Sequence, residues 1–159
     1  MDALIDLSSK NFSYYTIPAA FALCLLPGFY AVSLAGKNYD LANPRNLLET
    51  CSKDTSLAQN KPLLNQINRA KAAQANGFET LGLYAAAVVA ANSAGLAKAD
   101  LVKLNTLTIG YVISRTIYNF IYIHLQNNRR LAGLRPLAWG VGIYIIVSLF
   151  LSAGKLLNA

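Results

Sequence analysis

The sequence is short of charge and of the residues that build metal or disulfide sites. Only 13% of its 159 residues are charged, about half the share typical of a soluble domain. It contains seven acidic residues, one histidine and two cysteines, and Cys24 and Cys51 lack the spacing of a metal-ligand pair. These shortages exclude a disulfide-built fold and give no basis for a metal site. Phosphate-binding loops, nucleophile elbows and zinc-protease motifs are absent as well.

Apolar sequence is abundant instead, at 55% of the chain. A helix that crosses a bilayer needs about 20 mostly apolar residues. Four stretches qualify, over residues 14–36, 67–94, 101–125 and 134–157, with a polar loop over residues 37–66. Asp2 and Asp6 precede the first stretch, so it is interpreted as a permanent helix rather than a signal peptide. The sequence predicts an all-α integral membrane four-helix bundle, with residues 1–159 as one domain.

The basic residues are distributed unevenly between the predicted connections. Nine lie in or beside the first and third connections, and four lie on the other side. Because cytoplasmic loops carry an excess of Lys and Arg, both connections are predicted to be cytosolic. The net charge of +7 then reflects topology and attraction to anionic lipid head groups rather than nucleic acid, which is not an expected partner. The nine are Lys37, Arg45, Lys53, Lys61, Arg69, Lys71, Arg129, Arg130 and Arg135.

The third predicted span carries a polar stripe at helical spacing. An arginine at the centre of a membrane helix costs about 2.5–3.5 kcal/mol even on the lenient insertion scale, so Arg115 needs a partner. Glu79, on a polar stripe of the second span with Arg69 and Asn76, is the expected partner. A purely structural ion pair explains these two residues equally well. The stripe on the third span comprises Thr108, Tyr111, Arg115, Tyr118, Tyr122, Gln126 and Arg129.

The tyrosines on that stripe favour an interior pocket. Tyrosine near a membrane boundary is usually an interfacial anchor, but Tyr118 and Tyr122 share their stripe with Arg115 and Arg129. For Arg129 the alternative role is contact with lipid phosphate. His124 is interpreted as an interfacial residue rather than a ligand, since the chain has no second histidine.

Together the two stripes resemble a known family. Residues 69–79, Arg-Ala-Lys-Ala-Ala-Gln-Ala-Asn-Gly-Phe-Glu, are similar to the second-helix signature of the MAPEG family (membrane-associated proteins in eicosanoid and glutathione metabolism), whose core is Asn-x-x-Glu. Arg115, Tyr118, Tyr122 and Arg129 are similar to the third-helix pattern of its microsomal glutathione transferase and leukotriene C synthase branch. Chain length and the four spans agree with this resemblance, which covers nearly the whole chain.

The resemblance implies a homotrimer that binds glutathione between subunits near the cytosolic face. It implies that Arg129 lies beside the thiol, with Arg130 as the substitute. Many relatives carry an arginine at the position of Ala72, and Thr80 is a second departure from the pattern. The residues implied to contact glutathione, or to belong to the same polar cluster, are Gln74, Asn76, Glu79, Arg115, Tyr118 and Tyr122.

These features predict a glutathione-dependent membrane transferase or peroxidase that acts on lipophilic electrophiles or lipid hydroperoxides. The chemistry suits the residues, because thiolate is the reactive form of a thiol and a guanidinium stabilises it without acting as a base. The alternatives are a non-catalytic protein that binds and presents lipids, favoured by Ala72, and a membrane isomerase or cyclase. The resemblance further implies the endoplasmic reticulum or another endomembrane, with membrane lipids and a lipophilic small molecule as partners.

Overall fold

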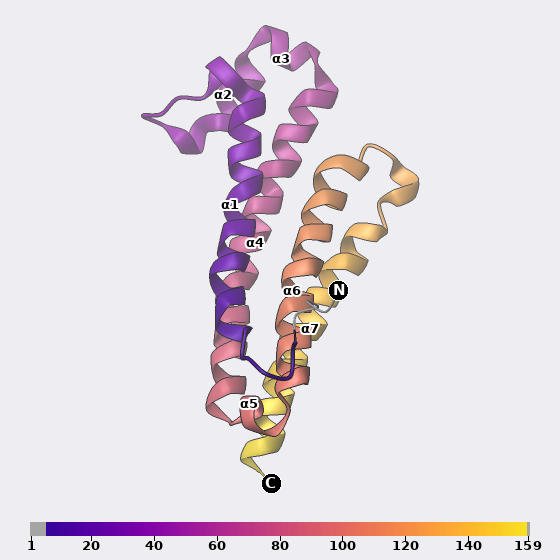
Figure 1. Ribbon diagram of the computed structural model, residues 1–159. Helices are drawn as coiled ribbons and strands as arrows, with labels where there is room; N and C mark the ends of the chain where they lie inside the picture. Colours follow the sequence, from indigo (N-terminus) through magenta and orange to yellow (C-terminus); the bar gives the residue numbers. More distant parts are fainter. Residues whose placement is uncertain (1–5, 159) are drawn as a thin grey trace.

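The computed structural model describes residues 6–158, and they form an all-α fold. Four long helices run up and down along one direction (Figure 1): α1 (Thr16–Ala35), α4 (Lys61–Ser93), α6 (Leu101–Phe120) and α7 (Leu134–Leu157). No strand occurs within the described residues, which confirms the predicted fold class. The shorter elements are η1 (Ser13–Tyr15), η2 (Gly36–Asn38), η3 (Pro44–Asn46), α2 (Leu47–Lys53), α3 (Thr55–Gln59), α5 (Leu96–Ala99), the π-helical turn η4 (Ile121–Leu125) and η5 (Arg129–Leu131).

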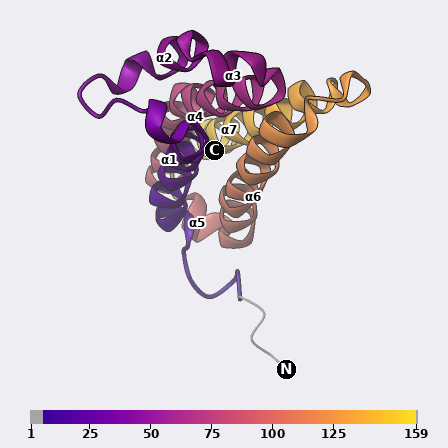
Figure 2. The ribbon, with the colours of Figure 1, turned by 90° about the horizontal axis from the view of Figure 1, so that it is seen from above.

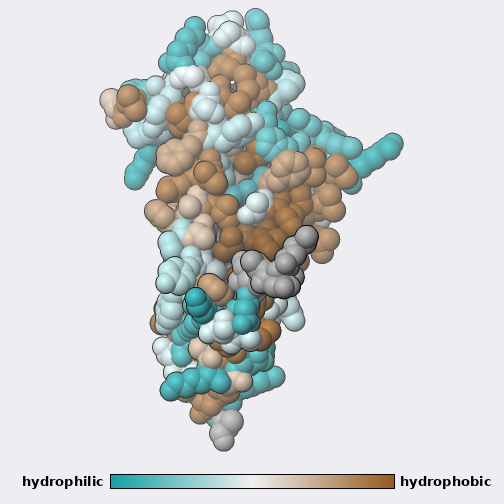
Figure 3. Space-filling model, viewed as in Figure 1, coloured by the Kyte–Doolittle hydropathy of each residue, from teal (hydrophilic) through white to brown (hydrophobic). Residues whose placement is uncertain are grey.

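Two helical segments are long and apolar enough to cross a membrane, Ser13–Asn38 and Arg129–Leu157. Helices α4 and α6 are also long, but polar residues make their mean hydropathy lower than that of α1 and α7. Hydrophobic residues gather over the middle of the visible face, and hydrophilic residues gather toward its two ends (Figure 3). This distribution suits a membrane environment, whereas the passage of all four helices through the bilayer stays a prediction.

The four helices form two pairs that diverge toward one end. Helix α1 packs along α4, and α6 packs along α7. The pairs converge where α5 and the last turns of α7 lie. They separate toward the layer of α2 and α3 and toward the connection between α6 and α7 (Figure 1). We call the first the termini end, because α1 begins and α7 ends there (Figure 1), and the second the loop end. The separation matters for function because the polar stripes of α4 and α6 extend into it.

The predicted polar loop over residues 37–66 is largely helical. Asp54 caps α3 by accepting a hydrogen bond from the amide of Leu57 at 2.9 Å, and Asn60 caps α4 by accepting from Leu63 at 3.3 Å. The hydroxyl of Ser56 also bonds Asp54 and holds the pKa of that carboxyl below its usual value. Leu47 and Leu57 are buried, and viewed from above α2 and α3 lie across the loop end (Figure 2). The connection is therefore a packed layer.

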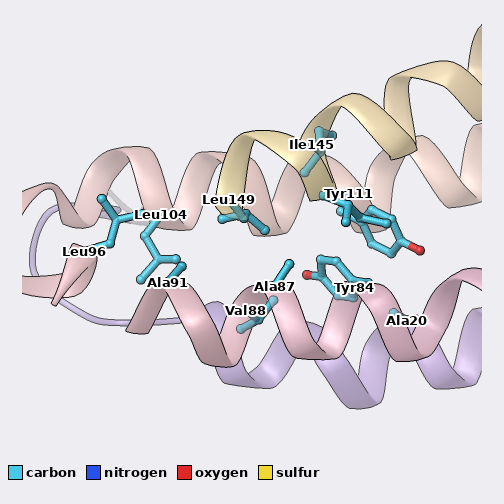
Figure 4. Packing of buried hydrophobic residues seen from close by; sticks show 11 residues of the cluster. Ala20, Tyr84, Ala87, Val88, Ala91, Leu96, Leu104, Tyr111, Ile145 and Leu149 are labelled. Carbon is cyan, nitrogen blue, oxygen red and sulfur yellow. The ribbon is translucent and has the colours of Figure 1, made fainter. Parts of the chain in front are cut away.

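The core toward the termini end is built around two stacked tyrosines. The rings of Tyr84 and Tyr111 lie 3.7 Å apart between centroids and are almost parallel (Figure 4). Tyr84 donates a hydrogen bond to the carbonyl of Thr108 at 3.1 Å, and Tyr111 donates to the hydroxyl of Thr80 at 3.3 Å. Both phenol groups are thus satisfied, which is what burial of a polar group requires. Small residues of α4, such as Ala87, let the neighbouring helices approach.

A proline in α1 creates a link to α6. Pro27 has no amide hydrogen, so the carbonyl of Leu23, four residues earlier, loses its helical partner. The side chain of Asn119 on α6 donates to this carbonyl at 2.9 Å. The bond replaces the missing helical hydrogen bond and ties the two helix pairs together where they begin to separate.

Candidate functional site: a polar cleft between α4, α6 and α7

A cleft of about 450 Å³ opens between the helix pairs toward the loop end. Its α4 wall comes from one stripe of that helix, because residues three and four positions apart share a helical face. The opposite walls come from α6, the π-helical turn and the first turns of α7. The lining residues are Ala72, Ala75, Asn76, Glu79, Tyr118, Tyr122, Arg135, Pro136 and Trp139.

A buried arginine lies beneath the cleft and is held by an amide. Arg115 is only 5% exposed; its Nη2 donates to Oδ1 of Asn76 at 2.8 Å, and its guanidinium lies over the ring of Tyr118 at 4.3 Å from the centroid. Asn76 in turn donates from Nδ2 to Oε2 of Glu79 at 3.5 Å. The predicted direct ion pair between Arg115 and Glu79 is wrong, because the amide, which both accepts and donates, bridges the two charges. Glu79 thereby stays exposed in the cleft.

A second arginine, Arg135, faces the cleft from α7. Its guanidinium lies 4.7 Å from the ring centroid of Tyr122, and the rings of Tyr122 and Tyr118 meet edge to face at 5.7 Å. Two arginine–tyrosine contacts of this kind therefore form one wall. From the sequence, Arg135 was counted only among the basic residues that predict which connections are cytosolic. Its spacing of four residues from Trp139, which also lines the cleft, is the signal that could have identified it.

Arg129 and Arg130 lie elsewhere. Both are exposed in the short helix η5, and neither lines the cleft. The predicted stripe assumed a continuous α-helix as far as residue 129, but α6 ends at Phe120 and is followed by a π-helical turn and a bend. Because this change of helix type ends the 100° spacing of the side chains, Arg129 does not continue the stripe of Tyr118 and Tyr122.

Gln74 points to the other side of α4. Its side chain lies against α1 at Gly28, where a Cβ atom would come within 2.1 Å of Gln74 Nε2. Its Oε1 accepts a hydrogen bond from Nζ of Lys71 at 2.7 Å. The structure therefore brings together five of the predicted site residues and leaves Gln74 and Arg129 outside the cleft. The five are Asn76, Glu79, Arg115, Tyr118 and Tyr122.

Arg69 connects α4 to the π-helical turn near the loop end. It lies three residues before Ala72 on the same helical stripe, and its Nε donates to the carbonyl of Ile123 at 3.2 Å. Its Nη2 is buried and has no hydrogen-bond partner within the described chain. Arg69, Arg115 and Arg135 outnumber the single carboxylate of Glu79 around this region, so the cleft favours anionic ligands.

The bundle and its cleft define a helical, membrane-associated protein with an anion-favouring polar pocket between its helices. Residues 14–155 match the model of the MAPEG family, and the chain belongs to that family. Membership places the protein in general among membrane proteins of glutathione or eicosanoid metabolism. No curated protein and no solved structure matches the chain.

Proposed function

We propose that the protein is a glutathione-dependent transferase or peroxidase for lipophilic electrophiles or lipid hydroperoxides. The observation that carries this proposal is the wall in which Arg115 lies against Tyr118 and Arg135 against Tyr122. A cleft of about 450 Å³ is within the usual range for small-molecule sites.

The groups in the cleft suit the charges of glutathione. The tripeptide carries two carboxylates, one ammonium group and a thiol, and arginine is a preferred donor to carboxylates. Arg135 is exposed to the cleft, whereas Arg115 acts from beneath through Asn76. The exposed carboxylate of Glu79 is suited to the ammonium group. The amide of Asn76, held by Arg115, fixes the position of that carboxylate.

A guanidinium beside the thiol explains how the reaction begins. A free thiol has a pKa of about 8.5, so little thiolate is present at neutral pH. A permanently charged arginine stabilises thiolate, and the proton leaves to water because the guanidinium cannot accept it. The sulfur then attacks the electrophilic carbon, a carbon–sulfur bond forms, and the leaving group departs with its electron pair. Of the arginines in the described chain, Arg135 lines the cleft, so we assign it this role in place of Arg129.

Paired arginine variants test the assignment. Purified protein in vesicles is supplied with glutathione and either 1-chloro-2,4-dinitrobenzene or a lipid hydroperoxide. Arg135→Ala is expected to lower kcat/KM by about 100-fold, the usual effect of removing one donor to a developing anion. Arg129→Ala is the matched control, because Arg129 is exposed outside the cleft, and it is expected to stay within about twofold of the native rate.

Two outcomes would contradict this proposal. A large loss of kcat/KM in Arg129→Ala, with none in Arg135→Ala, would show that Arg129 lies beside the thiol, as the family resemblance implies. No turnover and no glutathione binding by the native protein would remove the enzymatic function altogether.

A lipid-presenting protein without catalysis is the second candidate. Ala72 favours it, because this residue lines the cleft and offers no charge at the position where the family resemblance implies an arginine. Calorimetry separates the two candidates, since a presenting protein binds a lipophilic ligand but shows no heat of binding with glutathione.

We further propose that the protein forms a homotrimer in the endoplasmic reticulum or another endomembrane. Each subunit would cross the membrane four times, with its loop end in the cytosol. Gly82 and Ala86 support the assembly, because they are small, exposed and one turn apart on α4, and small residues let membrane helices pack closely. Arg129, Arg130 and Arg135 all lie near the loop end, as the preference for positive charge on the cytosolic side requires.

A further inference from the structure

A second hollow, which we call the α1–α6 groove, lies on the other face of α6. It has a volume of about 190 Å³ and is lined mainly by apolar side chains of α1, α6 and the π-helical turn. Leu26 and Phe120 flank it and are more than half exposed, at 56% and 58%. Asn119 and Leu23 both line it, and the hydrogen bond between them holds α1 and α6 together. The groove is therefore a built feature of the fold.

Three polar side chains from three elements meet at the loop end of this groove. Gln66 of α4 donates from Nε2 to the hydroxyl of Tyr30 at 2.9 Å, and the same nitrogen lies 3.4 Å from Nδ1 of His124. The rings of Tyr30 and His124 are 5.6 Å apart between centroids, and both residues line the groove. His124, interpreted from the sequence as an interfacial residue, is thus part of a polar cluster.

Among residues 6–158, the hydrogen-bond pattern leaves two donors of this cluster without an acceptor. The two amide hydrogens of Gln66 serve the oxygen of Tyr30 and Nδ1 of His124. A neutral imidazole whose Nδ1 accepts carries its proton on Nε2, and a phenol that accepts can still donate its own hydrogen. The Tyr30 hydroxyl and the His124 Nε2 hydrogen are then both available to one ligand. No acidic side chain lines the groove within the described chain, so nothing repels an anion there.

We propose that the α1–α6 groove binds the carboxylate end of a single-chain lipid, a fatty-acid-type ligand. The two carboxylate oxygens match the two free donors, and hydrogen bonds to a charged acceptor are the stronger kind. An apolar cavity of about 150 Å³ holds a benzene molecule, so the groove has room for the first carbons of one chain. The rest of the tail would lie along Leu26 and Phe120, whose side chains are exposed. This site is separate from the glutathione cleft and does not depend on it.

Photochemical labelling of the full-length protein in phosphatidylcholine vesicles tests this site. The probes are a long-chain fatty acid with a diazirine in its tail, its methyl ester, and a phosphatidylcholine with the same tail. Mapping of labelled peptides is expected to place the acid on residues 23–30 and 116–124, with at least fivefold more label than the ester. Equal labelling of these residues by the ester or by phosphatidylcholine would overturn the proposal, because the carboxylate would then not be recognised. A groove covered by a second copy of the chain would admit no probe and would overturn it equally.

Substitutions that remove each donor test their roles. Tyr30→Phe removes only a hydroxyl and is expected to weaken binding of the acid about tenfold, the usual loss for one hydrogen bond to a charged group. His124→Ala is expected to have a similar effect. The matched control is Tyr144→Phe on α7, since Tyr144 is 69% exposed and lies outside the groove. Unchanged labelling in Tyr30→Phe would contradict the proposed donor role, provided that the variant has native helix content and elutes like the native protein in size-exclusion chromatography.

Discussion

The two ends of the bundle differ in what fills the space between their helices. Toward the termini end the space is filled by stacked tyrosines and by amides whose hydrogen bonds are satisfied. Asn105 is fully buried; it accepts from the amide of Phe12 and donates to the carbonyls of Leu7 and Lys10. Toward the loop end the helices separate, and arginines, tyrosines and a π-helical turn surround two open hollows. The comparison predicts that substitutions at the termini end change stability most and that substitutions at the loop end change the proposed ligand binding most.

The largest expected effect is on stability and comes from the termini end. Tyr84→Ala removes a fully buried ring stacked on Tyr111 and should lower the free energy of unfolding by about 3–5 kcal/mol, as for other buried aromatic residues. Reversible unfolding in mixed detergent micelles measures this change. Tyr144→Ala, at an exposed position of α7, is the control and should have a small effect. Equal effects of the two substitutions would remove the distinction between the two ends.

At the loop end a charge change should alter binding more than stability. Glu79→Gln removes the carboxylate proposed to bind the ammonium group of glutathione, and the affinity should fall about tenfold, since one charge-assisted hydrogen bond is lost. Calorimetry measures the affinity, and thermal unfolding should stay near the native value because Glu79 is exposed. Glu49→Gln is the control, because Glu49 is an exposed carboxylate of α2 that does not line the cleft. This variant should bind glutathione with the native affinity.

Loss of the hydrogen bond between Asn119 and Leu23, which lies between the two ends, should lower the free energy of unfolding by an intermediate amount. Asn119→Leu removes the donor to the Leu23 carbonyl and leaves that carbonyl unsatisfied beside Pro27, at a cost of about 1–3 kcal/mol. The double variant with Pro27→Ala restores an amide hydrogen to the helix and should recover part of the loss. Thermal unfolding of the four combinations measures this coupling. Additive effects of the two substitutions would show that the asparagine does not compensate for the proline.

The smallest effect is expected at the surface of α2. Lys53 bonds Glu49 one turn away, and this contact holds the pKa of the Glu49 carboxyl below its usual value. Lys53→Met should let that pKa rise toward the usual range, so the carboxyl takes up its proton at a higher pH. NMR titration of carboxyl carbons detects this shift. The melting temperature should not change, because exposed ion pairs contribute little, and a clear decrease would show that the helical connection supports the bundle.

Much of the fold was predictable because apolar blocks and polar stripes are local patterns. The block lengths indicate long helices, and the spacing of Asn76, Glu79, Tyr118 and Tyr122 places each pair on one helical face. The cleft contains all four residues. The packed helices α2 and α3 were missed because their sequence is polar on average, and only a few residues such as Leu47 and Leu57 are buried.

The partners of the charged residues could not be predicted in the same way. Charge pairing alone favoured a bond between Arg115 and Glu79, whereas the packing of α4 on α6 places Asn76 next to the guanidinium. The position of Arg135 depends on where the chain turns between α6 and α7, which the helical spacing of α6 does not determine.

The sequence by itself determined the four long helices, the faces on which the polar groups of α4 and α6 lie, and membership of the MAPEG family. Only the tertiary structure decided that Arg135 rather than Arg129 faces the cleft, that Asn76 separates Arg115 from Glu79, and that His124 lies beside Tyr30 and Gln66. The reason is physical. Helical spacing results from hydrogen bonds between residues four apart, whereas the contacts of a side chain depend on the depth, rotation and ending of helices that are distant in sequence.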